Sequence, residues 1–135
     1  MVWRILVIDD DVAICRSIKR ILEADGYKVA TAETGDKGLK MVDQSSYDLL
    51  LLDLRLGGID GLEVLKRIKE SPDLKRIPTV MLTVSRRDED ILRGYNHGCN
   101  SFIQKPVEFE KFVEVVKEIS LYWGLLNVNS PNNSP

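Results

Sequence analysis

The chain has 135 residues, a net charge of −2 and a pI near 5.5, which fits a single domain. Because the charges leave no basic surface and no apolar run approaches the length of a membrane span, we expect a cytoplasmic protein that binds neither nucleic acid nor a membrane. The start of the chain has no secretory pattern. Cys15, Cys99 and the one histidine, His97, fit neither a disulfide framework nor a zinc site, so the cysteines are expected to be packing residues.

Short apolar runs alternate along the chain with segments of helical periodicity. Asp11 and Thr34 can cap helix starts, and Gly26 and Pro72 can end the helices before them. In chain order, the expected elements are strand 5–8, helix 12–25, a weak strand 28–32, a short helix after Thr34, strand 49–52, helix 60–70, strand 79–83, helix 87–97, a short strand 102–104 and a last helix from near Glu108.

Four consecutive leucines, Leu49 to Leu52, mark the centre of the predicted sheet. A run without alternation is typical of a parallel strand that is buried on both faces. The run stops at Asp53, and Gly57, Gly58 and Gly61 then mark a turn that must pass close to something. Open α/β sheets place ligands at the carboxyl ends of such strands, so Asp53 is the candidate reactive group.

Five strand-then-helix units in series predict an α/β fold, a parallel sheet doubly wound by helices on both faces through right-handed crossovers. We expect the flavodoxin-like (βα)5 arrangement with strand order 2-1-3-4-5. The folded domain is expected over 1–126. The tail 127–135, made largely of Asn, Ser and Pro, is expected to be disordered.

Polar residues of complementary type follow four of these strands: Asp9 and Asp10, then Asp53, Thr83 and Lys105. In the order 2-1-3-4-5 these ends converge on one crevice. Each residue alone has a plainer interpretation, as a helix cap, a turn residue or a surface lysine. Only their joint occurrence predicts a site.

The predicted crevice has the chemistry of phosphoryl transfer. Clustered carboxylates repel one another unless a divalent cation compensates them, and oxygen ligands alone favour a hard ion such as Mg²⁺. A lysine ammonium and a threonine hydroxyl beside the same acid can balance and hydrogen-bond a phosphoryl group. Asp53 would then be a carboxylate nucleophile that forms an acyl phosphate.

These residues at these spacings resemble the receiver domain of two-component response regulators, from about Arg4 to Ser120. The resemblance implies that Asp53 is phosphorylated by a partner sensor histidine kinase. It also implies that Mg²⁺ is held by Asp10, Asp53 and the main-chain carbonyl of Arg55, with Asp9 helping through water.

The same resemblance implies that Thr83 contacts the phosphoryl group and repositions, that Phe102 is the aromatic switch residue and that Lys105, before a cis proline, binds the phosphoryl group. Without an output module in these 135 residues, the chain resembles a single-domain regulator, and the ends of its last helix more weakly resemble regulators of bacterial phytochrome kinases. The implied function is a phosphorelay switch with slow autodephosphorylation and not a true enzyme.

Three positions depart from the family pattern. Gly57 stands where proline is usual, Val84 stands where a small residue is usual, and Arg55 lies two residues after the phosphoacceptor. The first two bear on the rate of phosphorylation and the third on the lifetime of the acyl phosphate. A haloacid-dehalogenase-like phosphatase, the enzyme alternative, would need an aspartate at position 55. A scaffold that binds partners without phosphorylation is the third possibility, which the intact acid cluster disfavours.

The last helix is more apolar than one buried face requires. Phe109, Phe112 and Val116 belong to a core stripe, and Tyr122 and Trp123 add apolar groups beyond it. Either the tail packs on its own domain, or the chain forms a homodimer through the face made by the fourth helix, fifth strand and last helix. The sequence names neither the cognate kinase nor the downstream target.

Overall fold

The computed structural model describes residues 2–54, 56, 60–83, 98, 101–104, 114, 117 and 118, of which 83 and 101–104 are described by their backbone alone. In chain order the elements are β1 (Arg4–Ile8), α1 (Val12–Ala24), β2 (Lys28–Ala32), α2 (Gly35–Gln44), β3 (Leu49–Asp53), α3 (Gly61–Glu70), β4 (Thr79–Thr83) and β5 (Ser101–Gln104).

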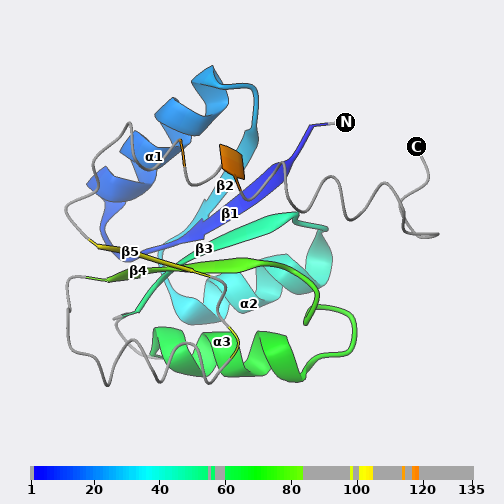
Figure 1. Cartoon of the computed structure of the whole chain (residues 1–135). Helices are drawn as coiled ribbons and strands as arrows, with labels where there is room; N and C mark the ends of the chain where they lie inside the picture. Colours follow the sequence, from blue (N-terminus) through cyan, green and yellow to red (C-terminus); the bar gives the residue numbers. More distant parts are fainter. Residues whose placement is uncertain are drawn as a thin grey trace.

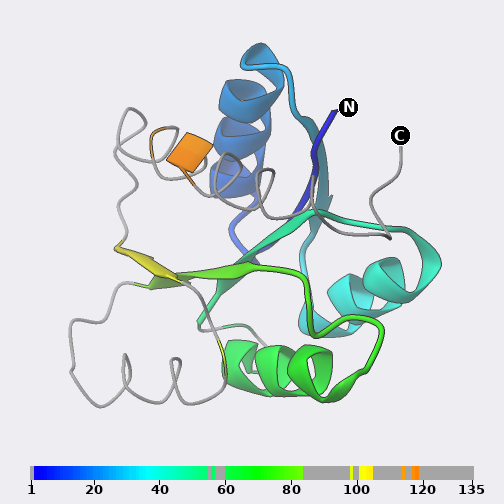
Figure 2. The same ribbon diagram turned by 45° about the vertical axis from the view of Figure 1, so that its right-hand side comes forward.

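All five strands form one parallel sheet in the order β2-β1-β3-β4-β5 (Figure 1). The predicted flavodoxin-like order is therefore confirmed. The sheet separates α1 on one face from α2 and α3 on the other (Figure 2). The predicted fourth helix, most of the predicted last helix and the tail 127–135 lie outside the described residues.

Two hydrophobic cores lie on opposite faces of the sheet because successive strand residues point in opposite directions. Leu50 and Leu52 of β3 face α2 and α3, whereas Leu49 and Leu51 face α1. All four side chains are fully buried, as the unbroken leucine run predicts. The predicted apolar stripes are confirmed, since α1 buries Cys15, Ile18 and Leu22, and α3 buries Leu62, Leu65 and Ile68.

Side-chain caps begin the helices where the sequence predicts. The Asp11 carboxylate accepts hydrogen bonds from the amides of Ala13 and Ile14, at 3.0 and 3.3 Å, and the Thr34 hydroxyl accepts one from Lys37 at 3.1 Å. Gly26, at φ +96, follows the end of α1 in the left-handed region that glycine tolerates. Helices α1 and α2 thus start only a few residues past the ends of β1 and β2, whereas α3 follows β3 after the longer loop 54–60.

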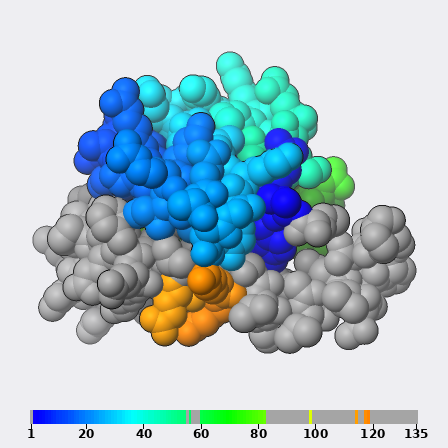
Figure 3. All heavy atoms as spheres, turned by 90° about the horizontal axis from the view of Figure 1, so that it is seen from above, coloured from blue at the N-terminus to red at the C-terminus, as the bar shows by residue number. Residues whose placement is uncertain are grey.

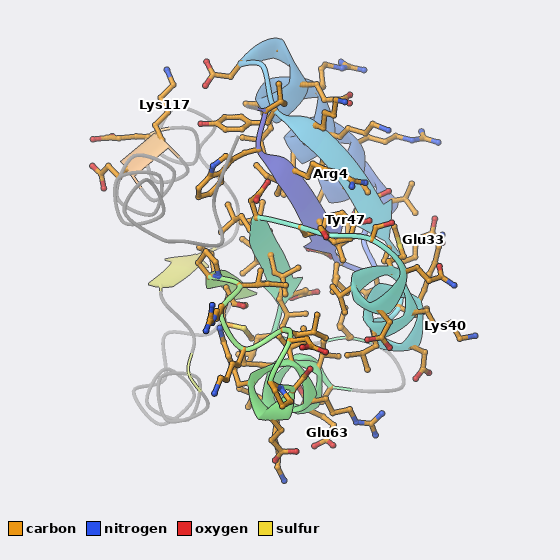
Figure 4. The ribbon with its side chains drawn as sticks, turned by 90° about the vertical axis from the view of Figure 1, so that its right-hand side faces the viewer. Arg4, Glu33, Lys40, Tyr47, Glu63 and Lys117 are labelled. Atoms are coloured by element: carbon orange, nitrogen blue, oxygen red, sulfur yellow. The ribbon has the colours of Figure 1, made fainter. Side chains whose placement is uncertain are left out.

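Two side-chain contacts lie at the amino edge of the sheet and at the end of α1. At the amino edge, the Arg4 guanidinium lies 5.3 Å from the centre of the Tyr47 ring (Figure 4). Near the end of α1, the Lys117 ammonium lies 3.4 Å from the Asp25 carboxylate, so Lys117 lies on the α1 side of the sheet (Figures 3 and 4). Both contacts are far from the edge where β1 and β3 end.

Helix α2 approaches β1 closely at Gly38, and this contact generates a stability prediction. A Cβ at Gly38 would overlap Cδ1 of Ile8 and lie 2.8 Å from its Cγ1. Overpacking costs roughly 1–3 kcal/mol, whereas alanine gains about 1 kcal/mol of helix propensity over glycine, so Gly38→Ala should lower the free energy of unfolding by roughly 1 kcal/mol. Urea unfolding measures the change.

The matched control is Ile8→Val, which removes Cδ1. Introducing Gly38→Ala into the Ile8→Val background should cost less than in wild type, since the overlapping atom is gone. A Gly38→Ala variant more stable than wild type would show that Ile8 does not restrict α2.

Candidate functional site

Three predicted site residues come from the carboxyl ends of β1 and β3, which are neighbours in the sheet. Ile8 pairs in register with Leu52, so Asp9 follows β1 beside Asp53, the last residue of β3. On its other side Asp53 pairs with Leu82 of β4, one residue before Thr83. The backbone of the sheet therefore gathers these ends at one edge (Figure 1).

The carboxylates of Asp9, Asp10 and Asp53 each offer an oxygen, and these oxygens lie within 4.8 Å of one another. Asp9 is fully buried and Asp53 is 5% exposed, whereas Asp10 is exposed. The cluster therefore has a buried base and one side open to solvent. Three close carboxylates repel, and a hard divalent cation that takes oxygen ligands while keeping some of its waters fits this donor set.

Main-chain contacts hold Asp9 at the base of the cluster. Its amide donates to the carbonyl of Ala32 at 3.0 Å, which extends the pairing of β1 with β2, and its carboxylate accepts from the amide of Asp11 at 2.9 Å. The Cys15 thiol donates to the Asp9 carbonyl at 3.3 Å from the first turns of α1. The position of this carboxylate is thus tied to both β2 and α1.

Asp53 is held by the neighbouring strand β4 and by the start of α3. The amide of Leu54 donates to the carbonyl of Leu82 at 2.8 Å, and the carbonyl of Leu54 accepts from the amide of Gly61 at 3.2 Å. Gly61 itself packs against the Asp53 main chain. The prediction that the glycine-rich turn passes close to something is confirmed at Gly61, and the neighbour is the phosphoacceptor candidate.

Other predicted site residues are only partly placed. Thr83 and Phe102 lie on β4 and β5, on adjacent strands, and are described by backbone alone. Arg55, Gly57, Val84 and Lys105 lie outside the described residues, although Lys105 directly follows the last residue of β5. Their roles stay predictions.

Cys15 is the residue near the site that sequence reasoning assigned to packing alone. The assignment to the core is confirmed, since the side chain is 4% exposed, but the thiol also contacts the Asp9 carbonyl. Helical periodicity predicts its burial and carries no signal for a contact with the preceding strand end. Burial, and secondarily the negative charge of Asp9, raise the pKa of this thiol to about 11.

A surface depression of about 410 Å³ lies between the end of α2 and the segment after α3, and its lining includes Tyr47, Ser71 and Ile77. Tyr47 and Ile77 precede the starts of β3 and β4. The depression is therefore at the amino edge of the sheet, opposite the acid cluster, and is not part of the site.

Comparison with known proteins finds a match to the response regulator receiver domain over residues 5–117. Transcriptional regulatory protein ResD of Bacillus subtilis (strain 168) is 33% identical over 134 residues, which cover 97% of this chain and 55% of ResD. Probable methanogenesis regulatory protein FilR2 of Methanothrix harundinacea (strain 6Ac) is 37% identical, over 88% of this chain and 82% of FilR2.

Among solved structures, that of a putative response regulator from Chloroflexus aurantiacus J-10-fl is similar, with a TM-score of 0.83 and 31% identity, over 88% of this chain and 98% of that one. The first curated relatives are longer proteins, and this chain spans only 55% of ResD and 45% of Transcriptional regulatory protein AfsQ1 of Streptomyces coelicolor. The similarity therefore covers only about half of each of these two relatives.

The environment of Cys15 generates a prediction of low thiol reactivity. Raising the pKa from 9.0 to about 11 lowers the thiolate fraction near pH 8 about a hundredfold, and burial further limits access. In a Cys99→Ser background, iodoacetamide should modify the folded protein far more slowly than the urea-unfolded protein, as followed by intact mass. Equal rates in the two states would contradict the assigned environment of Cys15.

Proposed function

Because the chain belongs to the response regulator receiver domain family, we propose that it is a phosphorylation-dependent signalling switch that accepts a phosphoryl group on Asp53 from a sensor histidine kinase. The observation that carries the proposal is the convergence of Asp9, Asp10 and Asp53 within 4.8 Å at the edge of the sheet. Receiver domains act as switches and not as true enzymes, bind Mg²⁺ through acidic residues and interact with histidine kinases.

In the proposed reaction, a carboxylate oxygen of Asp53 attacks the phosphorus of a phosphohistidine. The phosphorus–nitrogen bond breaks, its electron pair stays on the imidazole, and an acyl phosphate forms on Asp53. Attack by water at phosphorus later releases inorganic phosphate and restores the carboxylate. Asp53 is 5% exposed, so little of its surface is open to a phosphoryl donor.

Mg²⁺ would be held by Asp10, by Asp53 and by the main-chain carbonyl of Arg55, with Asp9 acting through water, and it supplies positive charge to a dianionic phosphoryl group. Asp9 suits the indirect role because its backbone is already bound to Ala32 and Cys15 and its carboxylate to the Asp11 amide. Asp10 suits the direct role because it is exposed, so an ion that keeps some of its waters can reach its carboxylate from solvent.

Thr83 and Lys105 would act on the phosphoryl group and not on the metal. Thr83 ends β4, which neighbours the β3 strand of Asp53, and Lys105 follows β5, the next strand beyond β4. The Thr83 hydroxyl and the Lys105 ammonium would hydrogen-bond and balance phosphoryl oxygens. Movement of Thr83 toward the phosphoryl group, with Phe102 on the adjacent strand, would carry the change to the partner surface.

The remaining parts of the proposal rest on the sequence. The single-domain arrangement, the homodimer through the fourth helix, β5 and the last helix, and the absence of nucleic-acid binding stay predictions. Within the described ranges, no helix has the length and apolar character needed to cross a membrane. A cytoplasmic location is proposed because a histidine kinase's phosphorylated domain is expected in that compartment.

The first test of the proposed function is phosphorylation by acetyl phosphate with Mg²⁺, read by intact mass. Wild type should gain one phosphoryl group, Asp53→Asn should gain none, and Asp10→Asn should lose most of the labelling because the ion is no longer held. Labelling that survives excess chelator would contradict the metal requirement, and labelling of Asp53→Asn would contradict the nucleophile.

The second test separates switching from metal binding. Lys105→Ala and Thr83→Ala should fold and bind Mg²⁺ but fail to switch, since neither residue belongs to the acid cluster. Beryllofluoride, which mimics a phosphoryl group on Asp53, should shift the amide resonances around Phe102 in wild type and not in Thr83→Ala. A full shift in Thr83→Ala would show that the signal travels by another route.

A further inference from the structure

Gly61, the first residue of α3, lies directly against the main chain at the end of β3. A Cβ built on Gly61 would overlap the main-chain oxygen of Asp53 and lie 2.8 Å from that of Leu54. Among the described glycines, those with positive φ are Gly26 and Gly98, so Gly61 is not needed for an unusual backbone conformation. What this position requires is space, because a backbone oxygen cannot move aside as the tip of a side chain can.

The contact closes the loop 54–60 that leaves the phosphoacceptor strand. At the first residue of the loop, the amide of Leu54 donates to the Leu82 carbonyl at 2.8 Å. Directly after the last residue of the loop, the amide of Gly61 donates to the Leu54 carbonyl at 3.2 Å. Arg55, whose carbonyl is the proposed metal ligand, is within this loop. The two hydrogen bonds therefore hold the loop on either side of Arg55, whose carbonyl the proposed metal site needs.

Helix α3 meets this loop with its own cap in place. The Asp60 carboxylate accepts from the amide of Leu62 at 3.0 Å, and the Asp60 carbonyl accepts from Val64 at 3.1 Å. The Asp60 side chain stabilises the first turn of α3. Gly61 has no side chain, and this allows the same turn to approach the Asp53 main chain closely. Since different atoms serve the two functions, one can be removed without the other.

We propose that Gly61 is a positioning residue of the phosphoacceptor site, which fixes the Asp53 carboxylate relative to Asp9 and Asp10 through direct packing on the Asp53 main chain. This inference rests on the proposed function. A methyl group at Gly61 has to displace α3 or the end of β3 by on the order of 1 Å to reach an ordinary contact distance. A displacement of that size in a reacting group can lower a rate about a hundredfold.

The test compares Gly61→Ala with the matched control Asp60→Ala. Both variants perturb the first turn of α3, but only Gly61→Ala forces a contact with Asp53. The rate of labelling by acetyl phosphate is measured over a range of donor and Mg²⁺ concentrations, beside circular dichroism and thermal unfolding. Should Gly61→Ala unfold in buffer, all proteins are measured in sucrose, which favours the compact state.

Gly61→Ala should retain the circular dichroism of wild type while its maximal labelling rate, at saturating Mg²⁺ and donor, falls about a hundredfold. Asp60→Ala should melt earlier than wild type and keep a labelling rate close to that of wild type, because the Asp53 contact is intact. If Gly61 stabilised only the fold, its labelling rate would fall only as far as the variant unfolds. A large loss of labelling rate in a folded Gly61→Ala variant is therefore specific to a positioning role.

Two results would overturn the inference: labelling of Gly61→Ala at the wild-type rate, or losses in both variants that follow only the unfolded fraction. Failure of the proposed function looks different, since wild type itself would then gain no phosphoryl group under the same conditions. The wild-type measurement therefore separates the two claims.

Discussion

The parallel pairing of β1 with β3 is the constraint on which the site depends. It places Asp9 and Asp10 together with Asp53, which lies 43 residues after Asp10, and it leaves two of the three carboxylates almost without solvent. Like charges in a region of reduced dielectric constant repel more strongly than in water. The leucine-rich strands, α1 on one face and α2 and α3 on the other hold this arrangement against the repulsion.

The same repulsion accounts for the ligand that the site favours. A cluster of carboxylates that is expensive to assemble gains most from a compensating cation, and the exposed Asp10 leaves a route for the ion and its waters. A doubly charged phosphoryl donor would be repelled by the acids alone. The proposed metal binding and the proposed phosphoryl transfer would thus be two consequences of one electrostatic arrangement, and not independent features of the fold.

The sequence predicted the sheet well because its strongest signals are local and unambiguous. The leucine run from Leu49 to Leu52 indicates a strand buried on both faces, and Asp11, Thr34 and Gly26 mark helix ends by their own hydrogen bonds or backbone conformation. The meeting of Asp9, Asp10 and Asp53 was also predicted, since the strand order alone determines which strand ends lie together. The confirmed elements are those that such local rules or the topology specify.

What the sequence did not predict depends on distances between elements. Gly38 occupies a helix in which any small residue would satisfy the periodicity, yet a Cβ there would overlap Ile8. At Gly61 the sequence predicted a close approach but did not identify the Asp53 main chain as the neighbour. The contact of Cys15 with the Asp9 carbonyl is likewise invisible to helical spacing. Close packing between a helix and a strand depends on the whole fold, and the periodicity of one element does not reveal which neighbour lies against it.

The order of the strands also has a kinetic consequence. In the chain, α1, β2 and α2 lie between β1 and β3, so the contact between Asp9 and Asp53 joins residues far apart in sequence, and such non-local contacts slow folding. Before that contact forms, each carboxylate is separately hydrated and experiences little repulsion. The repulsion at the acidic edge therefore acts on the native state and hardly at all on the unfolded chain. A cation bound at that edge would relieve a repulsion that only the folded chain experiences, and so would stabilise the folded chain against the unfolded one.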